Sequence, residues 1–216
     1  SNYNKVVLQR NKLLKELYLH PDYREVLDVL DMQLVQYGSA LIQRRQTFAE
    51  ELGEIVHRIH SQLSGGQEEM ELKYEPNVTV DAFAQMLFAN RERDMRLKTT
   101  ATGPHRDDIS FVVNGVDIRK FGSQGQQRTA ALSLKLSEIE LVKRLIGDTP
   151  VLLLDDVLSE LDSGRQNYLL NSIENIQTLI TCTGLDEFVN HRFSINRIYK
   201  VTDGSVTVEN KQEADR

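Results

Sequence analysis

The sequence has only one cysteine and no long hydrophobic run, and each shortage excludes a class of protein. Its single cysteine, Cys182, cannot form a disulfide within the chain and suits a reducing compartment. No stretch approaches the ~18 consecutive apolar residues of a membrane-spanning helix. The formal net charge is −6, so any contact with nucleic acid must come from a local basic patch.

What remains is the composition of an ordinary globular protein. Hydrophobic residues make up 40% of the 216 residues and charged residues 27%. That length suits one large domain or two small ones. We expect a helical arm domain over residues 1–100 and an α/β domain over residues 101–216.

The first hundred residues carry apolar side chains at helical spacing. Residues 3–19 form a rough stripe, and a stronger stripe covers residues 23–63 without a proline. One helix over the second stripe would measure ~60 Å. We therefore expect it to project as an arm or to break near Gly38 or Gly53. A third helix is expected over residues 79–99.

The end of this third helix is basic. Positive charge is favourable at a helix C-terminus, and the same side chains could instead bind the phosphates of a nucleic acid. The four residues are Arg91, Arg93, Arg96 and Lys98.

Residues 151–156 are the centre of the second half of the chain. Four apolar residues in a row predict a strand buried on both faces, as in a parallel sheet covered by helices. Asp155 and Asp156 follow at its carboxyl end, where open α/β sheets bind ligands. Such a pair is typical of a Walker B strand, in which one carboxylate holds Mg²⁺ and the next acts on the attacking water.

Two further strand patterns follow. Residues 178–183 predict a strand parallel to residues 151–154, and Thr183 would end it within reach of a γ-phosphate. Residues 197–208 predict a hairpin on the two-residue turn Asp203-Gly204.

Residues 123–126 have the pattern of a phosphate-reading helix start. Ser123 with Gln126 three residues later is a capping box, and a long apolar pattern continues to Gly147. Gly125 would let a phosphate approach the backbone. The order of this motif, one helix and then a Walker B strand is that of the ABC ATPases.

Residues 63–67 read Leu-Ser-Gly-Gly-Gln, the ABC signature pentapeptide, but in the wrong context. A working signature opens a helix, so that its amides face a phosphate. Here an acidic stretch and a strand pattern follow. We interpret these residues as a helix end and a turn.

Four segments together resemble the RecF family, the bacterial recombination and repair ATPases of the ABC/SMC-like class. They are residues 7–11, 102–108, 122–128 and 152–170. The resemblance covers nearly the whole chain. It implies an α/β fold: the C-terminal half of an ABC/SMC-type P-loop ATPase head, with a parallel sheet core, helices and a terminal β-hairpin, plus a long-helix arm domain.

The resemblance implies roles for single residues. Asp155 would bind Mg²⁺, Asp156 would take the place of the catalytic acid, and Asp162 would lie in the loop that crosses a dimer interface. The residues that would read the γ-phosphate of ATP on a second subunit are Ser123, Gln124, Gly125 and Gln126. Most ABC ATPases carry Glu at the position of Asp156, so we expect slow hydrolysis.

The chain departs from the family in having no Gly-x-x-x-x-Gly-Lys-Ser/Thr sequence, the P-loop of RecF-like proteins. We interpret it as the C-terminal part of such a protein, inactive as an ATPase by itself. For the full-length protein the resemblance implies ATP and Mg²⁺ as cofactors and an ATP-dependent homodimer. It also implies binding to single-stranded gaps and single-strand/double-strand junctions of DNA, RecR and RecO as partners, RecA loading, and a cytoplasmic, nucleoid-associated location.

Three other classes of function are considered. The ATPase of an ABC transporter shares the head motifs, but the helical arm of ~100 residues and the absence of a membrane segment count against it. A metal-dependent nuclease could use Asp107 and Asp108 with Asp155 and Asp156 as a two-metal site, but it would leave residues 123–126 without a role. Alternatively, the chain is a non-enzymatic module whose arm binds DNA or a partner protein.

Overall fold

The computed structural model describes residues 1–17, 21–158, 161–182 and 196–209. They fall into two compact units, residues 1–145 and residues 146–216, and each unit is described by itself. In no helix of the described ranges do length and apolar character together suffice to span a membrane.

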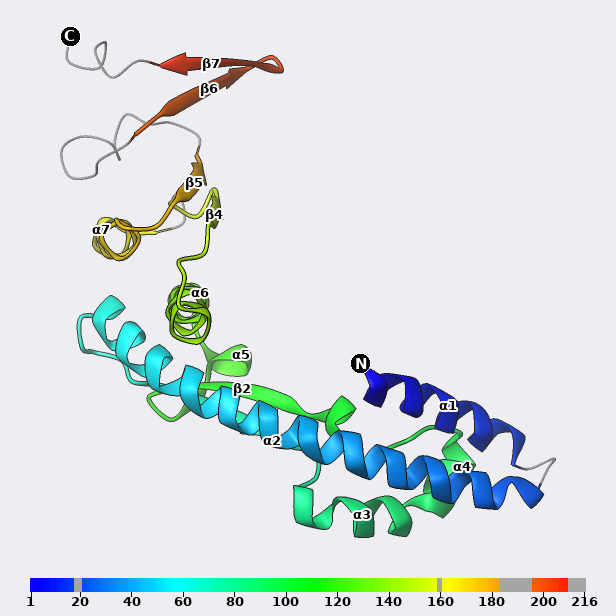
Figure 1. Cartoon of the computed structure of the whole chain (residues 1–216). Coiled ribbons are helices and arrows are strands. Elements are labelled where there is room, and N and C mark those ends of the chain that lie inside the picture. The colour runs from blue at the N-terminus through cyan, green and yellow to red at the C-terminus, as the bar shows by residue number, and fades with distance from the viewer. Residues whose placement is uncertain (18–20, 159–160, 183–195, 210–216) are drawn as a thin grey trace. The chain divides into compact units, whose positions relative to one another are not determined.

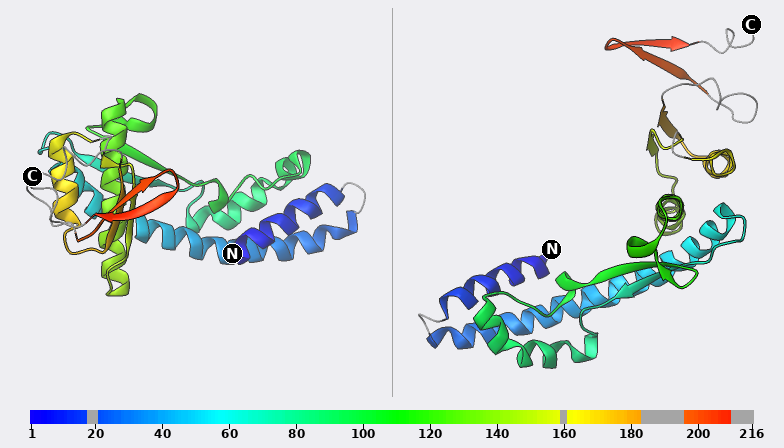
Figure 2. Two further views of the ribbon diagram at one scale, coloured as in Figure 1. Left: turned by 90° about the horizontal axis from the view of Figure 1, so that it is seen from above. Right: turned by 180° about the vertical axis from the view of Figure 1, so that it is seen from behind.

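The first unit is built around one long helix, α2 (Figure 1). α1 and α3 pack along its N-terminal part, and β1 packs farther along it, which both views in Figure 2 show. The helices up to the unit boundary are α1 (Asn2–Glu16), α2 (Arg24–Leu63), α3 (Val80–Ala89), α4 (Arg91–Leu97), α5 (Ile118–Phe121) and α6 (Gln124–Ile146), with 3-10 turns η1 (Pro21–Tyr23) and η2 (Pro104–Arg106).

α2 runs unbroken for 40 residues, so neither of its glycines interrupts it. Gly38 serves packing instead, because a Cβ there would come within 2.4 Å of the Phe83 ring on α3. The core that α1, α2 and α3 share is apolar and fully buried at its centre, with side chains that include Leu14, Leu34, Ile42, Phe83 and Leu87.

The helix expected over residues 79–99 is two helices. α3 ends at Ala89 and α4 begins at Arg91. Asn90 separates them, and its side-chain amide donates to the hydroxyl of Thr102 at 2.9 Å. An asparagine side chain that bonds outside the helix favours a break over continuation.

A three-stranded antiparallel sheet crosses the boundary expected at residues 100–101. Its strands are β1 (Met70–Glu75), β2 (Asp108–Val113) and β3 (Val116–Asp117). β1 pairs with β2 from Met70↔Val113 to Glu75↔Asp108. The compact unit therefore includes both sides of that boundary, and the division into arm and head stays a prediction.

The second unit contains a two-stranded parallel sheet and a hairpin. β4 (Leu152–Asp155) pairs in parallel with β5 (Thr178–Thr181), and α7 (Ser163–Ser172) lies between them in the chain. β6 (Ile198–Thr202) and β7 (Ser205–Glu209) form the expected antiparallel hairpin, whose turn residues both have positive φ.

The burial expected for β4 is wrong in the described residues. Leu154 is 9% exposed, but Leu153 is 72% exposed and its neighbour Leu179 on β5 is 55% exposed. The physical reason is that one face of this small sheet is left uncovered by the residues that the structure describes.

Candidate functional site

Residues 122–126 form a tight corner between α5 and α6. Gly122 has no room for a side chain, because a Cβ would come within 2.6 Å of the Ile118 carbonyl oxygen. The predicted capping box is confirmed: the Gln126 N–H donates to Ser123 Oγ at 3.2 Å, and the Ser123 N–H donates to Gln126 Oε1 at 3.0 Å. The corner therefore begins a 23-residue helix with an ordered first turn.

This corner is open to solvent. Ser123, Gln124 and Gly125 are exposed and Gln126 is half-buried. Since Ser123 Oγ accepts from the helix, its own hydroxyl hydrogen can be donated outward. A long helix's N-terminus, with its backbone N–H groups and positive dipole end, is suited to an anion such as phosphate.

The structure adds Glu68, which the motifs did not indicate, to this corner. Gln126 Nε2 donates to Glu68 Oε1 at 2.9 Å, and Glu68 follows the turn after α2. That turn is the Leu-Ser-Gly-Gly-Gln segment. The Gly66 N–H donates to the Ser61 carbonyl and the Gly65 N–H to the Gln62 carbonyl, which is a Schellman ending. The segment ends a helix, as we interpreted it.

Asp155 and Asp156 lie at the carboxyl end of β4, as predicted. Asp155 is exposed and accepts from the Thr181 hydroxyl of β5 at 2.5 Å. Asp156 has φ +51° and its N–H donates to the Thr181 carbonyl at 3.1 Å. A carboxylate beside a hydroxyl fits Mg²⁺, which is usually held by one or two carboxylates and several waters.

Asp162 begins α7. Its carboxylate accepts the Arg165 N–H at 3.0 Å and pairs with the Arg165 guanidinium. The pKa of Asp162 lies below its usual value. The main cause is the hydrogen bond from the Arg165 backbone N–H, and the Arg165 guanidinium adds to it. Thr183 lies outside the described residues, so its predicted role stays a prediction.

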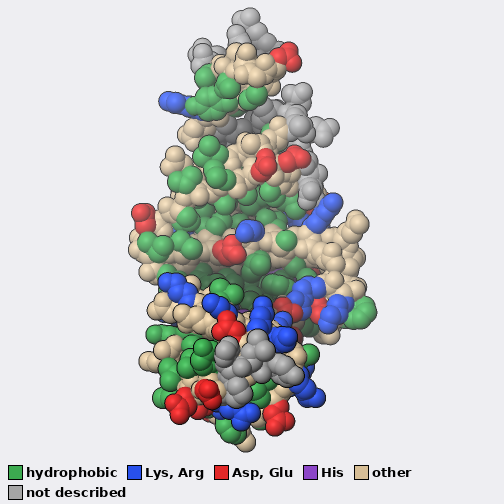
Figure 3. Space-filling model, turned by 90° about the vertical axis from the view of Figure 1, so that its right-hand side faces the viewer, with side chains coloured by type: hydrophobic (Ala, Val, Ile, Leu, Met, Phe, Trp, Pro, Cys, Tyr) green, Lys and Arg blue, Asp and Glu red, His purple; other side chains and the backbone are tan. Residues whose placement is uncertain are grey.

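The four basic residues around α4 differ in their availability. Arg91 pairs with Asp28 at 2.5 Å and Asp31 at 2.7 Å, so its charge is already used within the arm. Arg93, Arg96 and Lys98 are exposed. Figure 3 shows basic side chains interspersed with acidic ones on the face it displays. A role in nucleic-acid binding stays a prediction, and it is weakest for Arg91.

A buried arginine in the family-like segment 7–11 joins three helices. Arg10 is 0% exposed, and it donates to Asp31 on α2 at 2.6 Å and to Asp94 on α4 at 2.7 Å. It also donates to the Thr100 hydroxyl at 3.0 Å. The signal for this role was in the sequence: Arg10 occupies an apolar position of the α1 stripe.

The acidic side chains of segment 102–108 are held by hydrogen bonds and ion pairs to other residues of the first unit. Asp107 accepts from Arg45 at 2.9 Å, from the Tyr74 hydroxyl at 2.5 Å and from the Asn77 N–H at 2.9 Å. Asp108 pairs with Arg119 at 3.0 Å. Because both carboxylates already accept hydrogen bonds or pair with an arginine, they are poor candidates for the ligands of a two-metal nuclease site. The part of the chain that the structure describes has no group of three or more His, Cys, Asp or Glu placed to hold a metal.

His105 in the same segment is a structural hydrogen-bonding residue. Its Nε2–H donates to the Thr100 carbonyl at 2.9 Å, so its Nδ1 accepts from the Tyr3 hydroxyl at 2.7 Å. Burial lowers the pKa of His105 and raises the pKa of Tyr3. Both groups are therefore neutral near pH 7, and together they tie the segment to α1.

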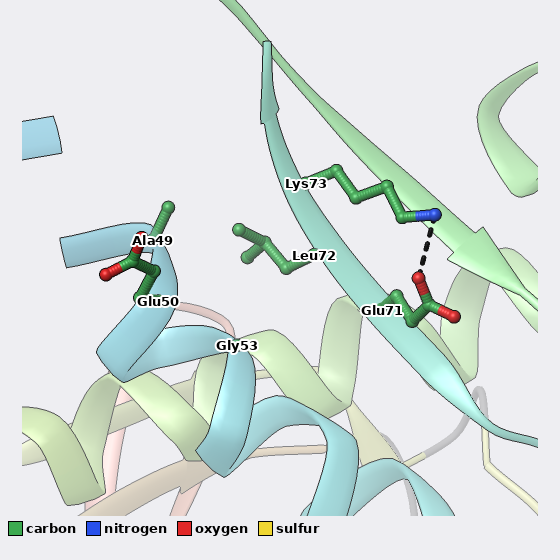
Figure 4. A pocket seen from close by; sticks show the side chains of 6 residues that line it. All are labelled: Ala49, Glu50, Gly53, Glu71, Leu72 and Lys73. Carbon is green, nitrogen blue, oxygen red and sulfur yellow. Dashed lines mark ion pairs between the residues drawn. The ribbon is translucent and has the colours of Figure 1, made fainter. Parts of the chain in front are cut away.

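A shallow hollow between α2 and β1 is lined by none of the predicted site residues. Figure 4 shows Leu72 pointing toward α2, whereas Lys73 and Glu71 pair with each other on the opposite side of the strand, at 2.8 Å. The other lining residues are Ala49, Glu50 and Gly53. Because its lysine is already paired, this hollow offers little to an anionic ligand.

This chain is similar to curated proteins that carry the name DNA replication and repair protein RecF. It is 58% identical to the DNA replication and repair protein RecF of Lachnospira eligens over 211 residues, which are 97% of this chain and 58% of that protein. It is 41% identical to the protein of the same name from Clostridium perfringens, over 94% of this chain and 57% of that protein. No family model matches.

A solved structure of the recombination mediator protein RecF with ATP, in the RecFOR pathway, superposes with a TM-score of 0.84 at 34% identity. The match covers 96% of this chain and 57% of that one. The α/β fold class predicted from the sequence is confirmed by this match. The chain spans a little over half the length of the curated relatives it matches.

Proposed function

Since this chain resembles the RecF proteins along nearly its whole length, as its motifs predicted, we propose that it forms the arm and the C-terminal half of the ATPase head of a RecF-type protein. The complete protein works in the cytoplasm in recombinational repair and replication of gapped DNA. It binds single-strand/double-strand junctions, cooperates with RecR and RecO, and so supports the loading of RecA.

The observation that carries the proposal is the exposed, capped start of α6. Ser123 keeps its hydroxyl hydrogen for an outside acceptor, and the first-turn residues Gln124 and Gly125 are exposed to solvent. Because these 216 residues contain no P-loop sequence, an ATP molecule whose phosphate reaches this corner has to be held by residues outside this chain. Residues 123–126 thus read ATP across a head-to-head dimer.

The Walker B residues supply the other half of the chemistry. When bound, Mg²⁺ would neutralise phosphate charge, and Asp155 is the residue that would hold it. Asp156 orients a water, and its short side chain makes hydrolysis slow, which suits a switch. Asp162 lies in the loop that meets the second subunit.

The chain alone lacks the lysine and the amide cradle that do most of the phosphate binding. We therefore expect no appreciable ATP binding or hydrolysis by the 216-residue polypeptide. Titration calorimetry with Mg-ATP measures this directly, and tight binding would contradict the proposal.

The decisive test uses a full-length protein that contains this chain. Ser123→Arg should leave ATP binding intact, abolish ATP-driven dimerisation, and lower hydrolysis at least about hundredfold, because an oxyanion donor is replaced by a bulky side chain. Asp156→Asn should keep the metal ligand and trap an ATP-bound dimer. Dimerisation is followed by light scattering and hydrolysis by phosphate release.

Gln67→Arg is the matched control, because it adds the same charge at an exposed position of the other signature-like segment. It should leave dimerisation unchanged. Mixing Ser123→Arg with a P-loop mutant restores one composite site and should recover part of the activity. Loss of dimerisation in Gln67→Arg but not in Ser123→Arg would mean that residues 63–67 are the signature after all.

A further inference from the structure

A chain of hydrogen bonds links the end of α2 to the corner at residues 122–126. His60, in the last turn of α2, is 0% exposed. Its Nε2 lies 3.1 Å from Glu68 Oε2, and its Nδ1 lies 3.0 Å from the hydroxyl of Ser133 on α6. The other carboxylate oxygen of Glu68 accepts from Gln126.

The donors in this chain are fixed by chemistry. The Glu68 carboxylate can only accept, so both His60 Nε2 and Gln126 Nε2 must present hydrogens to it. The Ser123 backbone N–H can only donate, so the Gln126 oxygen must face it. The amide of Gln126 thus has one orientation that satisfies both neighbours, and Glu68 selects it.

We propose that Glu68, held in place by His60, is a positioning residue for the ATP-reading corner, an inference that rests on the proposed function of residues 123–126. By fixing the Gln126 amide it keeps the Ser123 N–H paired and the capping box closed. The Ser123 hydroxyl and the exposed start of α6 at Gln124 and Gly125 are then in place for the phosphate before ATP arrives.

The surroundings of Glu68 support a specific role in holding Gln126 rather than general packing. Glu68 is 20% exposed in its side chain, so it is screened from water on most sides. A hydrogen bond to a charged acceptor in such surroundings is about twice as strong as one between neutral groups. The turn at residues 64–66, whose two glycines have positive φ, delivers Glu68 to this position.

The first experiment uses the 216-residue chain itself. The side-chain amide hydrogens of Gln126, followed by NMR exchange, should exchange about tenfold more slowly than those of exposed Gln67. Glu68→Ala should abolish this protection. Glu68→Gln should retain it, because its amide oxygen still accepts from Gln126 and its amide nitrogen can donate to His60 Nε2 once that nitrogen carries no hydrogen. Glu69→Ala, the exposed acid next in sequence, is the control and should change nothing.

The second experiment measures hydrolysis in a chimera in which this chain replaces the aligned 58% of the Lachnospira eligens RecF protein. Glu68→Ala should lower kcat about tenfold and change KM for ATP less than about twofold, because the P-loop holds the nucleotide. Glu68→Gln should recover activity to within about threefold of the parent chimera.

The outcomes separate the two hypotheses. Retained amide protection in Glu68→Ala overturns the positioning role, and so does lost protection with unchanged kcat or with a rise in KM alone. If the parent chimera does not hydrolyse ATP, or Ser123→Arg does not affect it, the proposed function fails. The exchange measurement then decides by itself whether Glu68 orients Gln126.

Discussion

The two units of this chain differ in how completely they bury their own apolar side chains. In residues 1–145 the central leucines are out of contact with water, and Leu34 is 0% exposed. In residues 146–216 Leu153 is 72% exposed and Val201 is 68% exposed. The first unit closes its core with its own helices, whereas the described residues of the second leave one sheet face and a hairpin open.

The units differ in their polar contacts as well. The first joins distant segments through buried ion pairs, such as that between Arg10 and Asp94 at 2.7 Å. In the second, the described pair of Asp162 with Arg165 is local and exposed. Stability should therefore depend more strongly on ion pairs between distant segments in the first unit than in the second.

The largest effect is expected for Arg10→Met. The substitution keeps the apolar stem but leaves the fully buried Asp94 carboxylate without its guanidinium, so it should lower the free energy of unfolding by about 3–5 kcal/mol. Urea unfolding followed by circular dichroism measures it. Lys12→Met, an exposed change on the same helix, should stay within about 0.5 kcal/mol. Equal effects of the two variants would show that the buried network contributes nothing specific.

A pair of leucines tests the comparison between the units directly. Leu34→Ala creates a cavity in a closed core and should cost about 3 kcal/mol. Leu153→Ala removes atoms that are already in water and should cost less than about 0.5 kcal/mol. Both are measured by urea unfolding of the purified chain. A comparable cost for Leu153→Ala would mean that its face is covered in solution.

A smaller loss of stability than for Arg10→Met or Leu34→Ala is expected at Asp162, where the second unit relies on a local contact. Asp162→Ala removes the N-cap of α7 and should cost about 1 kcal/mol at pH 7. Because the folded-state pKa of Asp162 is lowered, its contribution is present above the unfolded pKa and is lost as the pH falls through the folded pKa.

Asp162→Asn is the matched variant, since asparagine also caps a helix but does not titrate. Its α7 should remain stable at pH 7 and should lack the acid dependence that is expected of the parent below pH ~4, where an unfolded aspartate begins to bind a proton. Unfolding curves at several pH values distinguish the variants. An unchanged acid dependence in Asp162→Asn would assign it to other carboxylates.

The sequence by itself determined the local structure of this protein. Apolar spacing without proline predicted the long helix, Ser123 with Gln126 predicted the capping box, and Asp203-Gly204 predicted the last turn. These features depend on residues a few positions apart, so short-range rules of helix capping and turn geometry are enough to specify them.

Only the tertiary structure decided which polar residues work together. Arg10 meets Asp94 across 84 positions, and Gln126 meets Glu68 across 58. The same is true of Arg91, whose charge is used by Asp28 and Asp31. A side chain's partner at such separations depends on how helices pack, which no local pattern contains. The sequence therefore predicted residues 123–126 as candidates for reading a phosphate, whereas the contact between Gln126 and Glu68 could be seen only in the structure.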